Sequence, residues 1–106
     1  MNSIIQDRKE CYFCRALADQ EGYYGDLTDK GLHRHHIIYG GGRRRLSEQY
    51  GLWIWLCPDH HNMGGEESVH NNKTLRRFTE RIAQKAWETK RSREEWVRIF
   101  GRNYLD

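Results

Sequence analysis

The sequence predicts a small α+β domain in which two short strands are followed by helices. Two segments, residues 32–40 and 52–57, have the branched, aromatic and apolar composition of strands. The C-terminal third repeats its apolar residues every three or four positions, which is typical of helices. The length of 106 residues favours one domain over residues 1–106. Three cysteines and six histidines in so short a chain indicate bound metal, which would strengthen a modest core.

The N-terminal part contains the first pair of cysteines. Cys11 and Cys14 are spaced C-x2-C, which predicts a tight turn with both thiols on one side. We expect a short helical turn within residues 15–22 and a loop over the Gly- and Asp-rich residues 22–31. An odd number of cysteines makes a disulfide framework a poor interpretation, so metal ligands in a reducing cytosol are favoured.

The middle of the chain contains both predicted strands. The first, residues 32–40, leads into a flexible basic loop over residues 40–45. One helical turn is expected over residues 46–51, ending at a glycine. The second strand, residues 52–57, is a run of six apolar residues. Because both of its faces are apolar, we expect it to be covered on both sides.

The C-terminal third is predicted to be helical after a turn-rich segment at residues 58–72. The residues expected on the apolar face of the first helix are Leu75, Phe78, Ile82 and Ala86. Ser92 and Glu95 form a capping-box pattern, so a second helix is expected to start at Ser92. Its buried face is expected to contain Trp96, Ile99 and Phe100, and Gly101 is expected to end it.

The charge is unevenly distributed around a formal net value of +3. Residues 30–47 contain five basic residues and no acidic residue, and residues 68–93 contain eight basic and two acidic residues. Such regions suit a polyanionic partner, and a solvated surface is the equal alternative. The sequence has no long apolar run and no signal-peptide pattern at its start, so we expect no membrane partner and a cytoplasmic location.

The first candidate site combines two pairs of ligands, each pair three residues apart. Cys11 and Cys14 form one pair, and Cys57 and His60 form the other. Two such pairs complete a tetrahedral zinc site, which predicts a structural Zn²⁺. His33 is the alternative fourth ligand, and three buried free thiols are the alternative to a metal site.

The second candidate site is a group of histidines around the predicted strands. His35 and His36 are neighbours on the first strand, and His61 and His70 follow the second strand. Adjacent residues of a strand point to opposite faces, so the two neighbours are expected to do different work. One would bind a second metal ion and the other would face a substrate.

Taken together, these motifs resemble the HNH endonuclease family, the ββα-metal nucleases, and in particular its small phage-encoded members. The resemblance covers residues 11–72. It implies a zinc-stabilised ββα-metal core, built from a two-stranded antiparallel hairpin and a helix. Residues 73–106 would then be a helical C-terminal extension.

The resemblance also implies a role for each histidine. His35, His61 and His70 would bind one catalytic divalent metal ion, and His36 would be the catalytic general base. The family usually carries an asparagine between the histidine pair and the second zinc-binding pair, where this sequence has Gly51 and Leu52. Glu48, Ser47 or a backbone carbonyl would have to take over the work of that asparagine.

The implied function is a metal-dependent DNA endonuclease that hydrolyses phosphodiester bonds with one metal ion and a histidine base. The ion would be Mg²⁺, Mn²⁺, Ni²⁺ or Zn²⁺, and the DNA would be double-stranded or branched. Cutting both strands with a single site requires two copies, which makes a homodimer one of the expected partners. A phage protein of this kind would work in the cytoplasm of the bacterial host.

The residues expected to contact DNA phosphates are Arg43, Arg44 and Arg45, with a solvated Gly-Arg loop as the alternative. A zinc-bound nucleic-acid-binding or adaptor module without cleavage activity is the alternative function. The missing asparagine favours this alternative, whereas the complete histidine set argues against it. A redox or zinc-storage protein is a third hypothesis, which leaves the histidine pair unexplained.

Overall fold

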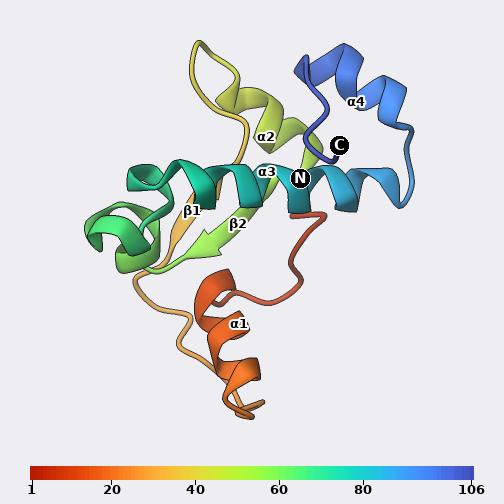
Figure 1. Ribbon diagram of the computed structural model, residues 1–106. Helices are drawn as coiled ribbons and strands as arrows, with labels where there is room; N and C mark the ends of the chain where they lie inside the picture. The colour runs from red at the N-terminus through yellow and green to blue at the C-terminus, as the bar shows by residue number, and fades with distance from the viewer.

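The computed structural model describes residues 1–106 and has one antiparallel sheet surrounded by short helices (Figure 1). The strands are β1 (His33–His36) and β2 (Trp53–Leu56), and the α-helices are α1 (Tyr12–Gln20), α2 (Arg44–Tyr50), α3 (Lys73–Glu88) and α4 (Arg93–Phe100). Between β2 and α3 lie a π-helical turn, η1 (Asp59–Met63), and two 3-10 turns, η2 (Gly65–Glu67) and η3 (Val69–Asn71). The α+β class and the two-stranded antiparallel sheet are therefore confirmed. No helix combines the length and the apolar character needed to span a membrane.

Both strands are shorter than the sequence predicts. In the register of the sheet, His35 lies opposite Ile54 and His36 lies opposite Trp53. Beyond His36 the chain turns toward α2, where the buried hydroxyl of Ser47 accepts from the N–H of Ile38 at 2.8 Å and donates to its carbonyl at 2.6 Å. Because the backbone of Ile38 finds its partner in a side chain of α2, the strand ladder ends early.

The two faces of the sheet bury different kinds of side chain. One face joins the apolar core, whose largest fully buried members include Trp96, Leu52, Ile54 and Leu56. The opposite face carries Trp53, which is buried, and Trp55, which is half-buried. The guanidinium of Arg34 lies over these two rings, at 3.8 and 5.3 Å from their centroids. Both faces of β2 are covered, as its composition predicts.

Helix α1 begins earlier than predicted, at the first cysteine pair. The thiol of Cys11 is the N-cap and accepts from the backbone N–H of Cys14 at 3.4 Å. Sulfur therefore does the work that a serine or aspartate oxygen does at other helix starts. The C-x2-C pair lies across the first turn of a helix, where we expected a separate tight turn.

Helix α2 also begins earlier than predicted and takes in part of the expected basic loop. Arg44 and Arg45 lie in its first turn, so only the glycines and Arg43 precede it. The helix ends as predicted at Gly51, which has a left-handed φ of 71°. A Cβ atom at this glycine would also clash with the backbone carbonyl oxygen of Asn2, so a side chain is excluded for two reasons.

The buried face of α3 differs from the apolar face that the sequence predicts. Phe78, which lies on the predicted face, is 44% exposed. The residues that are buried are Thr79, Ala83, Gln84 and Trp87. The Thr79 hydroxyl donates to the carbonyl of Arg76, and the Gln84 side chain accepts from the N–H of Tyr104. Because these hydrogen bonds satisfy the buried polar groups, the helix packs in a rotated orientation.

Helix α4 follows the prediction closely. Ser92 is the N-cap, and its hydroxyl accepts from the N–H of Glu95 at 3.1 Å. Trp96 and Phe100 are buried, Ile99 is half-buried, and Gly101 ends the helix with a φ of 84°. The helix packs at the end of the molecule opposite α1 (Figure 1).

Candidate metal centres

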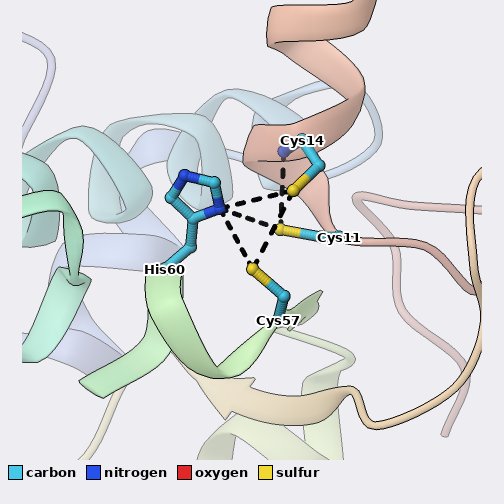
Figure 2. A group of neighbouring side chains, drawn as sticks. All are labelled: Cys11, Cys14, Cys57 and His60. Atoms are coloured by element: carbon cyan, nitrogen blue, oxygen red, sulfur yellow. Dashed lines mark hydrogen bonds between the residues drawn. The ribbon is translucent and has the colours of Figure 1, made fainter. Parts of the chain in front are cut away.

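The three cysteines and His60 meet at one point between α1 and η1. Figure 2 shows the thiols of Cys11 and Cys14 from the start of α1, together with Cys57 and His60 from the end of β2 and η1. The Nδ1 atom of His60 lies 3.4, 3.5 and 3.2 Å from the sulfur atoms of Cys11, Cys14 and Cys57. A tetrahedral zinc ion separates its sulfur and nitrogen ligands by about 3.5–3.8 Å. The four residues can therefore hold a metal ion, and His60 rather than His33 is the fourth member.

Two of these thiols, Cys11 and Cys14, are held in their protonated form while no cation is bound. Burial raises the pKa of the Cys11 thiol. Burial, together with the neighbouring Cys11 group, raises the pKa of Cys14 to about 12. A cation at this point would reverse this preference, because the thiolate is the form that binds metal.

A second cluster brings together the three histidines expected to share an ion. His35 comes from β1, His61 from η1 and His70 from η3. The Nε2 atoms of His61 and His70 are 3.0 Å apart, and the ring centroid of His35 lies 5.5 and 5.2 Å from theirs. These residues lie far apart in the sequence, so only the fold brings the three rings together.

His35 is the most deeply buried of these three side chains. It is 1% exposed, and neither of its ring nitrogens has a hydrogen-bond partner. Burial, followed by the charges of the neighbouring histidines, lowers the pKa of His35 to about 3 and that of His61 to about 4. Burial also lowers the pKa of His70. At neutral pH these imidazoles are uncharged and carry lone pairs, which is the form that binds a metal ion.

His33 has a role that the sequence did not reveal. Its Nδ1 atom lies 2.9 Å from Nδ1 of His61, on the side away from His70. If the Nε2 atom of His61 offers a lone pair to an ion, its Nδ1 carries the hydrogen and donates to His33. A hydrogen bond of this kind orients a metal-binding imidazole. The i, i+2 spacing of His33 and His35 on one strand face was the available signal.

His36 occupies a different environment from its neighbour, as the strand alternation predicts. Its Nε2 atom lies 3.1 Å from Oε1 of Glu48, and its Nδ1 atom accepts from Nε of Arg44 at 3.1 Å. A hollow of about 320 Å³ is lined by both members of the pair. Its other lining residues are Arg34, Tyr39, Gly40, Arg44, His61 and His70. One hollow therefore contains the three-histidine cluster and a separate imidazole.

The three arginines expected to act together have three different positions. The guanidinium of Arg43 donates to the carbonyl of Phe100 at 2.6 Å, which joins α2 to α4. Arg44 donates to His36 inside the hollow. Arg45 is exposed on the first turn of α2. All three residues are exposed, and Arg45 is the one whose side chain makes no hydrogen bond or ion pair with the rest of the chain.

No protein-family model, no curated protein and no solved structure matches this chain. The resemblance to HNH endonucleases therefore stays a prediction from the sequence motifs.

Proposed function

We propose that the protein is a metal-dependent nuclease that hydrolyses phosphodiester bonds in DNA. One observation carries the proposal: the buried, unpartnered imidazole of His35 faces His61 and His70, and His36 opens onto the same hollow. One-metal hydrolysis of a phosphodiester requires a metal site and a general base, and a histidine cluster beside a separate imidazole can supply both.

The second cluster fits a transition-metal ion. Its three members offer neutral nitrogen donors, a set that suits Zn²⁺, Ni²⁺ or Co²⁺ better than Mg²⁺, which prefers oxygen. Three protein ligands leave positions for water and for a phosphate oxygen. When bound here, the ion would neutralise charge that develops on the scissile phosphate.

Other side chains that line the hollow can supply the general base and a contact to phosphate. His36 lies outside the three-histidine cluster, so its imidazole is available to take a proton from the attacking water. Arg44 reaches the same hollow and can pair with a phosphate oxygen. The Tyr39 ring, 5.5 Å from that of His70, forms part of the wall.

The cysteine cluster is proposed to hold a structural zinc ion. Such an ion would join the start of α1 to the end of β2 and to η1. His60 and His61 are neighbours in η1, and their backbone N–H groups both donate to the carbonyl of Cys57. Zinc at the first centre would therefore fix the backbone that carries a ligand of the second. In the proposed ββα-metal core, η1 and the two 3-10 turns occupy the place of the family's helix.

The two centres should differ in the protons that they release on binding metal. Cys11 and Cys14 must each lose a proton, so zinc binding at the cysteine centre is expected to release at least two protons per chain near pH 7. Loading the histidine centre with Ni²⁺ is expected to release almost none, because its imidazoles are already neutral. Calorimetry in buffers of different ionisation enthalpy measures both numbers. Equal proton release at the two centres would contradict this assignment.

The proposed activity is tested with supercoiled plasmid. Protein that retains its first metal ion is supplied with Mg²⁺, Mn²⁺, Co²⁺, Ni²⁺ or Zn²⁺ one at a time, and nicked and linear products are separated on a gel. Cleavage that depends on the added ion supports a nuclease. Binding of plasmid without cleavage, with every ion, supports the alternative of a zinc-bound nucleic-acid-binding or adaptor module.

The arginines are expected to respond differently to substitution. Arg45→Ala should reduce the slope of log affinity against log salt by about 0.9, the value for one lost phosphate contact, without changing the melting temperature. Arg43→Ala should instead lower the melting temperature by about 4–8 °C, because it removes a hydrogen bond worth about 1 kcal/mol between α2 and α4. Fluorescence anisotropy at several salt concentrations and thermal unfolding provide the two measurements. An unchanged salt slope in Arg45→Ala would mean that its side chain is only solvated.

A further inference from the structure

The imidazole of His36 is held at both of its ring nitrogens, by partners of opposite hydrogen-bonding character. At Nε2 lies the carboxylate of Glu48, which can only accept a hydrogen bond while it is ionised. At Nδ1 lies Nε of Arg44, which can only donate. Each partner independently requires the same tautomer, with the hydrogen on Nε2 and the lone pair on Nδ1.

We infer that Glu48 is a positioning residue, which fixes the ring of His36 with Nδ1 as the proton-accepting atom of the site. This inference rests on the proposed function, in which His36 is the general base. Both partners come from α2, but Arg44 lines the hollow and Glu48 does not, so Nδ1 is the ring nitrogen whose partner reaches the hollow. The proton acceptor therefore faces the space where a substrate would enter.

The carboxylate of Glu48 is itself fixed by the sheet. Nη1 of Arg34 lies 2.9 and 3.0 Å from its two oxygens. Arg34 and His36 are two residues apart on β1 and therefore share a face, opposite which α2 places Glu48. The hydrogen bond with His36 and the guanidinium of Arg34 lower the pKa of the Glu48 carboxyl group, which keeps it an acceptor.

The backbone of Glu48 is fixed by its neighbour. The Ser47 side chain is fully buried and bonds to both the N–H and the carbonyl of Ile38, two residues after His36. Ser47 thus ties α2 to the end of β1, and Glu48 spans from α2 back to the imidazole. A rigid pair of elements therefore carries both the base and the group that orients it.

Arg44 donates a hydrogen bond to Nδ1 of His36, the atom that has to accept the proton. The Arg44 side chain must therefore move when substrate binds. A guanidinium pairs more strongly with a charged phosphate oxygen than with a neutral imidazole. A phosphate in the hollow would therefore draw Arg44 away from Nδ1 and leave the lone pair for water. The Glu48 contact at Nε2 holds the ring in place during this exchange.

The test uses the zinc-loaded protein with Glu48→Ala, Glu48→Gln, and Glu21→Gln as a control on an exposed acidic residue at the C-cap of α1. Nitrogen NMR at about pH 8.5, above the ordinary pKa of imidazole, reports the tautomer of His36 without the second metal ion. We expect a single Nε2–H form in the native protein and in Glu21→Gln. A mixture of tautomers is expected in Glu48→Ala.

Cleavage kinetics give the second measurement. With saturating metal, Glu48→Ala should lower kcat by about 10- to 100-fold and leave KM unchanged. Glu48→Gln keeps an oxygen acceptor and should retain an intermediate kcat. A native Nδ1–H tautomer, or native kcat in Glu48→Ala while His36→Ala is inactive, overturns the positioning role but leaves the proposed nuclease standing. Native kcat in His36→Ala would show that His36 is not the general base. If Glu48→Ala fails to fold, the native tautomer and Glu48→Gln still decide the question.

Discussion

His36→Ala is expected to lower DNA cleavage by about 10²–10⁴-fold, the usual contribution of a general base. The fold, metal binding at both candidate centres and DNA binding should remain, because the His36 side chain belongs to neither cluster. Its partners Glu48 and Arg44 lie at the surface side of β1, away from the apolar core. Single-turnover cleavage, metal analysis and DNA-binding measurements on the same preparation would separate these effects.

The adjacent variant His35→Ala is the matched comparison and should fail in a different way. It removes one of three nitrogen donors, so activity should fall through weaker binding of the second ion and should recover partly in excess metal. His61→Ala should behave like His35→Ala. If added metal rescues His36→Ala and has no effect on His35→Ala, the two roles are reversed. Native rates in both variants would remove the proposed active site.

Cys57→Ser is expected to have the largest effect on stability. Binding at structural zinc sites contributes about 10–16 kcal/mol, which is comparable to or larger than the total stability of about 5–15 kcal/mol of most domains. Loss of a sulfur ligand should therefore release the ion and unfold the chain or lower its melting temperature sharply. Zinc content and circular dichroism during heating measure the two consequences.

The matched control for this variant is His60→Cys, which keeps four ligands in a set that zinc accepts. It should retain far more zinc and stability than Cys57→Ser. A strong chelator should reproduce the effect of Cys57→Ser on the native protein. Native protein without stoichiometric zinc, or a Cys57→Ser variant that melts like the native protein, would contradict a structural zinc centre.

Local spacing predicted the members of the cysteine cluster well. A C-x2-C pair and a C-x2-H pair each set two ligands on one turn, so the sequence was enough to expect the group that the structure brings together. The spacing already favoured His60 over His33, and the fold agrees with this choice, because His33 lies on the strand face next to His61. The contact between His33 and His61 could be predicted only by knowing where the segment after β2 lies in the fold.

The parts that sequence analysis missed depend on contacts between distant residues. The buried face of α3 was mispredicted because the polar Gln84 is satisfied by Tyr104, twenty residues later in the chain. The start of α1 was misplaced for a local reason, because a cysteine sulfur serves as its N-cap. The sequence named Glu48, Ser47 or a backbone carbonyl as the substitute for the missing asparagine. The structure gives them different contacts, with Ser47 bonded to backbone and Glu48 to the imidazole.

The most direct test of the account is DNA cleavage measured against the number of metal equivalents bound per chain. Metal-free protein is first loaded with one equivalent of zinc and then titrated with Ni²⁺ or Zn²⁺, while nicking of plasmid and metal content are followed together. Two separate clusters predict no cleavage with one equivalent bound, and activity that rises with the second and levels off at two. Full activity with a single ion, or no cleavage at any occupancy, would contradict a structural centre beside a catalytic one.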